Sequence, residues 1–159
     1  MEKTIISNTS PLRYLTCIDE QDLLPQLFTK ILIPKAVYLE LIHPNAPLIV
    51  QQYFHNLPTW IEVCEITSLK DNNAIYGLDA GETEAILLML QKQADLLLID
   101  DKKGRLTAEE HNLTIMGTLG ILELASRQHK ICLPQTINKL LQTNIKISPV
   151  LIEYILKRQ

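Results

Sequence analysis

Cysteine is scarce in this 159-residue chain, and its three copies lie far apart in the sequence. Cys17, Cys64 and Cys132 form no Cys-x-x-Cys pair, which excludes a disulfide framework and a cysteine-based zinc site. The four histidines also lack the spacing of metal ligands. The sequence therefore belongs to neither the cross-linked nor the zinc-stabilised class of small proteins.

Long apolar runs are missing as well. No segment approaches the roughly 20 apolar residues that a membrane-spanning helix needs. The apolar stretch within the first eight residues is too short for a signal peptide, and no cleavage site follows it. We therefore expect a cytoplasmic protein with no membrane partner.

An excess of positive charge is the third absence, because the formal net charge is −3. Proteins that hold nucleic acid by broad electrostatic attraction usually present a basic face. If this protein handles nucleic acid, it must use metal ions and local basic patches. Its 47% hydrophobic and 21% charged residues are ordinary for a folded chain, and its length suits one domain over residues 1–159.

Short apolar segments alternate with segments of helical character. We expect strands at residues 4–7, 31–33, 60–66, 95–99 and 113–116. We expect helices at about residues 11–18, 21–29, 35–42, 46–56, 79–93, 102–111, 118–128, 134–142 and 149–158. Ser10 and Pro11 are predicted as the N-cap and first residue of the first helix, and residues 67–78 as a polar loop.

This alternation predicts the α/β class: a three-layer α/β/α fold around a mostly parallel sheet of about four to five strands. In such sheets the functional residues lie beyond the carboxyl ends of the strands. Polar residues at these positions, or on the helices that follow, are the candidates for a site: Asn8, Thr9, Ser10, Glu40, Glu82, Asp100 and Asp101.

The adjacent carboxylates Asp100 and Asp101 cannot both be buried without compensation, because they repel each other and are costly to desolvate. A divalent cation removes that cost. Mg²⁺ or Mn²⁺ takes a few carboxylates, retains water and leaves positions for phosphate oxygens. The acids are therefore interpreted as a metal site.

Helix capping is the competing explanation for several of these residues. Asp79 and Glu82 stand three apart before an apolar helical run, as in a capping box, and for Asp79 we prefer this structural role. For Glu82 both roles remain open. Asn8, Thr9 and Ser10 could cap the first helix, and Asp100 or Asp101 the helix after them. Glu40 lies near a helix end, where negative charge is unfavourable, so a structural role explains it less well.

Five segments, taken in order, resemble the PIN domain family. They are Ser-Asn-Thr-Ser-Pro-Leu after the first strand, Ile-Pro-Lys-Ala-Val-Tyr-Leu-Glu-Leu after the second, Asp-Ala-Gly-Glu-Thr-Glu-Ala-Ile, Leu-Leu-Leu-Ile-Asp-Asp-Lys-Lys-Gly-Arg and Met-Gly-Thr-Leu-Gly-Ile-Leu. The resemblance covers about residues 4–128 and is strongest to a bacterial toxin-like subgroup related to the VapC toxins.

The resemblance implies a metal-dependent nuclease of RNA, with Mg²⁺ or Mn²⁺ as cofactor. Asn8 takes the place of the family's first aspartate, and Glu40, Glu82 and either Asp100 or Asp101 match the other acids. Asp101 is favoured as the direct ligand, with Asp100 close by. Thr9 or Ser10 matches the small hydroxyl residue that hydrogen-bonds within the acidic cluster.

The resemblance also implies partners. RNA would contact Lys102, Lys103 and Arg105, with Arg127 and Lys130 extending that patch. A cognate antitoxin and a homodimer are expected from the subgroup, in which the protein would be the toxin of a type II toxin–antitoxin pair.

Two other functions compete with the nuclease. Asn8 offers a neutral carbonyl oxygen where aspartate offers a charge, so the protein could be a catalytically weak or inactive module that binds RNA or protein. Leu-Leu-Leu-Ile-Asp-Asp also resembles the aspartate-bearing strand of phosphoacceptor receiver domains. Those domains need an acidic pair after the first strand, where this chain has Asn8 and Thr9.

Overall fold

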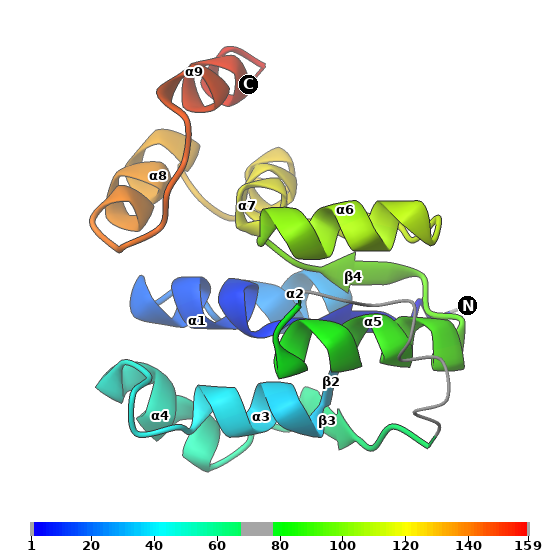
Figure 1. The fold of residues 1–159 in the computed structure, drawn as a ribbon. Helices are drawn as coiled ribbons and strands as arrows, with labels where there is room; N and C mark the ends of the chain where they lie inside the picture. The colour runs from blue at the N-terminus through cyan, green and yellow to red at the C-terminus, as the bar shows by residue number, and fades with distance from the viewer. Residues whose placement is uncertain (1, 68–77, 159) are drawn as a thin grey trace.

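A parallel five-stranded sheet forms the centre of the computed structural model, which describes residues 2–67 and 78–158 (Figure 1). Its strands are β1 (Ile5–Ser7), β2 (Ile31–Pro34), β3 (Ile61–Cys64), β4 (Leu96–Leu98) and β5 (Ile115–Met116). Their order is β3-β2-β1-β4-β5, and every neighbouring pair is parallel. The predicted α/β class is therefore confirmed, and all carboxyl ends meet at one edge.

The helices of the described residues follow the predicted order. They are α1 (Thr9–Cys17), α2 (Leu23–Phe28), α3 (Lys35–Leu41), α4 (Leu48–His55), α5 (Ala80–Lys92), α6 (Lys102–Glu110), α7 (Thr118–Arg127), α8 (Leu133–Leu141) and α9 (Pro149–Lys157). None of these helices is long and apolar enough to cross a membrane. The loop predicted for residues 67–78 lies, apart from its two end residues, outside the described part of the chain.

The predicted start of the first helix is wrong. The N-cap is Asn8 rather than Ser10, and its side chain makes no capping hydrogen bond. The Asn8 N–H instead donates to the Leu98 carbonyl at 2.8 Å, so the backbone keeps its contact with β4 until the helix begins. Pro11 then falls in the first turn, where the missing N–H costs nothing.

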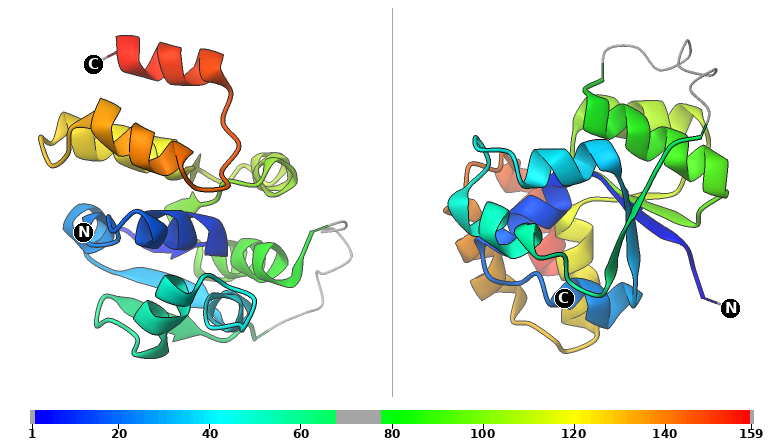
Figure 2. Two further views of the ribbon diagram at one scale, coloured as in Figure 1. Left: turned by 90° about the vertical axis from the view of Figure 1, so that its left-hand side faces the viewer. Right: turned by 90° about the horizontal axis from the view of Figure 1, so that it is seen from below.

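Alternating side chains of the strands enter two separate apolar clusters. Ile6, Leu97 and Ile99 face α5 and α6, together with Ala108. Ile5 and Leu98 face the opposite side, where the larger cluster includes α1, α7 and the C-terminal helices. Figure 2 shows the resulting layers from two further directions. Because both faces are covered, the sheet leaves its carboxyl edge as a place for polar side chains.

An ion pair fastens the last helix to α7. Glu123 is only 7% exposed, and both its oxygens accept hydrogen bonds from Arg158 Nη2, at 2.6 and 2.5 Å. Arg127 approaches the same carboxylate at 3.7 Å. The buried Ile155 adds an apolar contact between α9 and the main cluster.

We expect Arg158→Ala to lower the free energy of unfolding, because Glu123 would keep only the longer contact with Arg127. Urea denaturation would measure the change. Lys157→Ala, the exposed neighbour on the same helix, is the control and should cost less than about 0.5 kcal/mol. Equal losses in the two variants would contradict a role for the ion pair.

Candidate active site at the carboxyl edge of the sheet

Asn8 lies at the middle of the carboxyl edge, directly after the central strand β1. It is 3% exposed, and its Oδ1 is buried with no hydrogen-bond partner among the described residues. An unpaired buried carbonyl oxygen is costly, so this oxygen is available to accept a hydrogen bond or to bind a cation. The neighbouring strands bring Glu40, through α3, and Asp100 with Asp101, through the end of β4, to the same edge.

Glu40 is held by two donors from different elements. Thr9 Oγ1 donates to Glu40 Oε2, and the Gly81 N–H donates to Oε1 at 3.1 Å. Burial raises the pKa of Glu40, while these two hydrogen bonds oppose the rise. The side chain of Ser10 makes no hydrogen bond within the described residues, so Thr9 is the hydroxyl residue that contacts an acid.

Glu82 is the most perturbed carboxyl of the site. It is 7% exposed, and its Oε2 accepts no hydrogen bond within the described residues. Burial, followed by hydrogen bonds with Asp79 and Asp101 and by their negative charges, raises the pKa of Glu82 to about 9. Without a cation, the group is therefore held in its protonated form at neutral pH.

Both acids next to Glu82 also serve as helix caps. Asp79 accepts the Glu82 N–H at 2.8 Å at the start of α5, as predicted for its capping role. Asp101 accepts the Gly104 N–H at 3.2 Å at the start of α6. Helix capping and an approach to Glu82 are therefore compatible, because Asp79 and Asp101 each cap a helix and also lie beside Glu82.

Asp100 is held in a different environment from Asp101. Its two oxygens accept hydrogen bonds from Thr118, from the N–H at 2.7 Å and from Oγ1 at 2.6 Å. Burial raises the pKa of Asp100, and the charges of Arg105 and Arg13 act against that rise. Asp100 thus ties β4 to the start of α7, whereas Asp101 lies beside Glu82.

Because Gly81 and Gly104 have no side chain, the carboxylates of Glu40 and Glu82 can lie against their backbone. A Cβ at Gly81 would lie 2.7 Å from both oxygens of Glu40, and one at Gly104 would lie 2.8 Å from Glu82 Oε2. A Cβ at Gly104 would also lie 2.5 Å from Cδ1 of the buried Ile99, which has little room to move. No sequence pattern marks these glycines or Arg13 as site residues; the only signal is that Gly81 and Gly104 each lie next to or near a predicted acid.

The donor set suits a hard cation. Within residues 2–67 and 78–158, no three His, Cys, Asp or Glu side chains are gathered closely enough to form a metal centre. The buried oxygens of Asn8 and Glu82 nevertheless lack donors, and the surrounding ligands are carboxylates. Oxygen atoms of this kind fit Mg²⁺ or Mn²⁺, and each of the two orphaned oxygens could serve as a ligand of such a cation.

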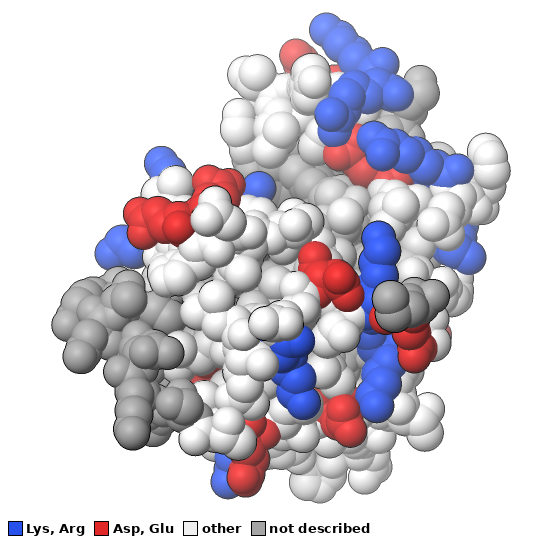
Figure 3. Space-filling view, turned by 90° about the vertical axis from the view of Figure 1, so that its right-hand side faces the viewer, with Lys and Arg blue, Asp and Glu red and all other residues white. Residues whose placement is uncertain are grey.

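The basic residues predicted to contact RNA divide into two groups. Lys102, Lys103 and Arg105 are exposed on the first turns of α6, next to Asp101. Arg127 and Lys130 lie at or beyond the far end of α7, and Arg127 is about 14 Å along the helix from Thr118. The face in Figure 3 shows basic and acidic side chains interleaved among the described residues, without a continuous basic track.

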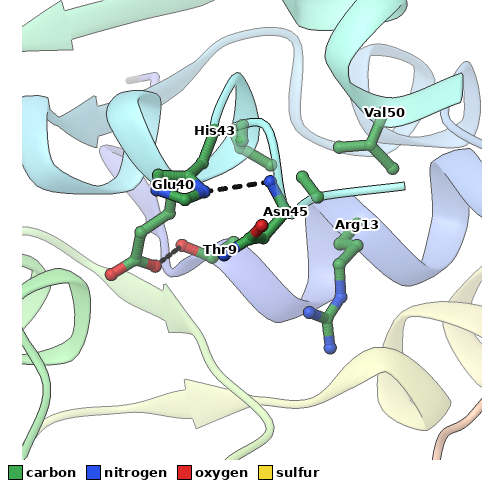
Figure 4. A pocket seen from close by; sticks show the side chains of 8 residues that line it. Thr9, Arg13, Glu40, His43, Asn45 and Val50 are labelled. Atoms are coloured by element: carbon green, nitrogen blue, oxygen red, sulfur yellow. Dashed lines mark hydrogen bonds between the residues drawn. The ribbon is translucent and has the colours of Figure 1, made fainter. Parts of the chain in front are cut away.

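A cavity of about 240 Å³ adjoins the acids at Glu40. Its polar wall includes Thr9, Arg13 and His43, and the buried Leu41 and Val50 form part of its floor. In Figure 4, Thr9 and Glu40 point toward each other, and the Arg13 side chain extends from α1. The carboxyl edge is thus both acidic and hollowed on one side.

A family model described as PIN domain matches residues 4–159, which is nearly the whole chain. No curated protein matches the sequence. The match agrees with the five-stranded parallel sheet.

Proposed function

This chain belongs to the PIN domain family, whose members are commonly nucleases that use divalent metal ions, and from this premise we propose that it is an Mg²⁺- or Mn²⁺-dependent endoribonuclease. The observation that carries the proposal is the pair of buried, unpartnered oxygens on Asn8 and Glu82. They lie at the one edge of the sheet where the fold gathers its acids.

Each acid has a distinct part in this proposal. Glu82 and Asp101 would hold the metal together with the Asn8 carbonyl oxygen, and Glu40 would complete the site from α3. Asp100 is close by, and its hydrogen bonds with Thr118 suit it to positioning α7 more than to coordination. A bound divalent metal supplies a water of lowered pKa and stabilises negative charge on the leaving oxygen of a phosphodiester.

The family supports nucleic acid as the substrate class, and the finer substrate and the biological role are our proposals. Nucleic acid is the substrate class of PIN nucleases, and we propose RNA, contacted by Lys102, Lys103 and Arg105 at the start of α6. We further propose a cytoplasmic toxin of a type II toxin–antitoxin pair that works as a homodimer with a cognate antitoxin. A small gene for a basic or ribbon-helix-type protein directly upstream is the expected genomic sign of this role.

Cleavage of a fluorescently labelled single-stranded RNA tests the enzyme proposal. We expect cleavage with Mg²⁺ or Mn²⁺, none with EDTA, and at least a hundredfold loss in Glu82→Gln and in Asp101→Asn. Glu109→Gln, an exposed acid near the far end of α6, is the matched control and should keep full activity. Activity that survives in the variant carrying both site substitutions would come from a contaminant.

A second candidate function is favoured by Asn8, which removes one negative charge from the centre of the edge. In this case the fold would act as an RNA- or protein-binding module with weak or no catalysis. Metal-dependent RNA binding without any cleavage by the unmodified protein would support the module and exclude the enzyme.

A further inference from the structure

Among the described residues, Arg13 is the one Lys or Arg side chain that lines the cavity beside Glu40. It follows Thr9 by four residues on α1, so the two side chains share one face of the helix. Thr9 contacts Glu40 directly, and Arg13 lines the same cavity one helical turn further along α1. Figure 4 shows the three side chains around the cavity.

The guanidinium of Arg13 is largely unengaged. It forms no ion pair with the carboxylates of the described residues. Its Nη2 donates one long hydrogen bond to the Tyr14 hydroxyl at 3.3 Å, and its Cζ lies 5.0 Å from the centre of the Tyr14 ring. A guanidinium has five N–H donors, so most of them remain for a ligand.

Arg13 interacts electrostatically with two acids of the carboxyl edge that come from different elements. Burial raises the pKa of Glu40, on α3, and that of Asp100, after β4, and in both cases the charge of Arg13 is the smallest of the effects that oppose the rise. The group is also half-buried, which strengthens its interaction with an anion compared with a fully exposed lysine. An RNA strand that approached the acids through this cavity would pass Arg13, and the net charge of −3 offers such a strand no wider attraction.

We propose that Arg13 binds a backbone phosphate of the substrate strand, next to the phosphate that is cleaved, and so directs the strand into the cavity lined by Thr9, His43 and Val50. This inference rests on the proposed ribonuclease function. The planar guanidinium matches two phosphate oxygens at once. The apolar floor of the cavity suits a sugar or a base edge. At its rim, the Asn45 N–H donates to His43 Nδ1 at 3.0 Å and so holds the His43 ring in place.

A purely structural role for Arg13, as a counter-charge to the acids, makes a different prediction. Removal of a counter-charge strengthens the binding of a metal cation and leaves RNA binding unchanged. Removal of a phosphate ligand weakens RNA binding. The two roles therefore differ in whether RNA affinity falls, and metal affinity gives an independent check on the integrity of the site.

The test measures RNA binding without cleavage, by fluorescence anisotropy of a labelled hexauridylate in the Glu82→Gln background. Adding Arg13→Gln should weaken binding about tenfold and reduce the slope of log affinity against log salt by about 0.7, the value for one phosphate contact on a single strand. Arg13→Lys, which keeps the charge without the planar fork, should retain the slope and recover only part of the affinity. Lys3→Gln removes the same charge before β1, at the amino edge of the sheet, and should change neither quantity.

Calorimetry of Mg²⁺ on Arg13→Gln, in the otherwise unmodified protein, completes the design. An unchanged or higher Mg²⁺ affinity together with weaker RNA binding supports the proposal. Unchanged RNA binding in a variant that still binds Mg²⁺ would overturn it, even if the protein cleaves RNA. A protein that binds RNA through Arg13 but never cleaves it would refute the ribonuclease and leave the phosphate contact standing.

Discussion

Metal-free protein should lose stability as the pH rises from about 4.5 to about 9, and Mg²⁺ should abolish this loss. The pKa of Glu82 is raised from 4.5 to about 9 in the folded chain, mainly by burial and then by Asp79 and Asp101. Between these values the folded state binds more protons than the unfolded state, so the free energy of unfolding falls with increasing pH. The raised pKa values of Glu40 and Asp100 act in the same direction.

The expected loss is on the order of 3 kcal/mol, given that one pKa unit corresponds to about 1.4 kcal/mol and that the neighbouring acids share the shift. A bound cation favours the ionised form of Glu82. At pH 7, metal binding should therefore release close to one proton, and the metal affinity should rise with pH. Urea denaturation at pH 5, 7 and 9, with EDTA or with Mg²⁺, would measure the stability. Calorimetry in two buffers of different ionisation enthalpy would count the proton.

The Glu82→Gln variant tests whether the ionisation of Glu82, and not that of other groups, causes the pH dependence of stability. The amide cannot ionise, so the variant should be more stable than the unmodified protein at pH 9 in EDTA, with a much flatter pH dependence and little stabilisation by Mg²⁺. Glu109→Gln, whose side chain is exposed, should behave like the unmodified protein. A pH dependence that is the same in Glu82→Gln would show that another group is responsible.

The fold was accessible to sequence reasoning because its signals are local. Apolar strands such as Ile31–Pro34 and Leu96–Leu98 are separated by helices with their own start and stop residues. Such alternation specifies a parallel sheet before any contact is known. The one clear error, the N-cap of α1, arose because the Asn8 N–H bonds to β4, and β4 begins more than eighty residues later in the chain.

The site was accessible only in part, because its arrangement depends on contacts between distant segments. The sequence could place Asp100 and Asp101 at the edge, but neighbouring residues of a chain turn in different directions, and only the fold puts Asp100 against Thr118 and Asp101 beside Glu82. The roles of Gly81 and Arg13 could not be predicted from the sequence either. Both depend on Glu40, which lies on a different helix from each of them.

The same dependence explains why a capping interpretation and a metal interpretation could not be separated at Asp101. A carboxylate at a helix start satisfies N–H groups whether or not a second acid approaches it. Glu82 makes the difference, because it brings a third carboxyl group, with a buried oxygen that has no donor, next to the two capping acids. The helix starts of α5 and α6 therefore provide the framework of the candidate metal site.

Asn8→Asp should change the behaviour of the protein more than any other single substitution at this edge. In EDTA, the new carboxylate would be buried without a donor and beside other acids, so we expect the free energy of unfolding at pH 8 to fall by several kcal/mol. With Mg²⁺, the added negative charge would face the cation directly, and the Mg²⁺ affinity should increase at least tenfold. The difference in the free energy of unfolding between Mg²⁺ and EDTA should therefore be much larger in Asn8→Asp than in the unmodified protein.

Calorimetric Mg²⁺ affinity and thermal unfolding, each with and without EDTA, would measure both effects. Asn8→Ala is the control, because it removes the carbonyl oxygen without adding charge; it should weaken Mg²⁺ binding and leave stability in EDTA nearly unchanged or raised. Equal Mg²⁺ affinity in the Asn8→Asp variant and the unmodified protein would place the cation away from β1 and remove Asn8 from the site. A higher Mg²⁺ affinity together with faster RNA cleavage in Asn8→Asp would show that the neutral amide of Asn8 limits catalysis in this chain. The oxygen at this position would then affect both metal binding and the cleavage rate.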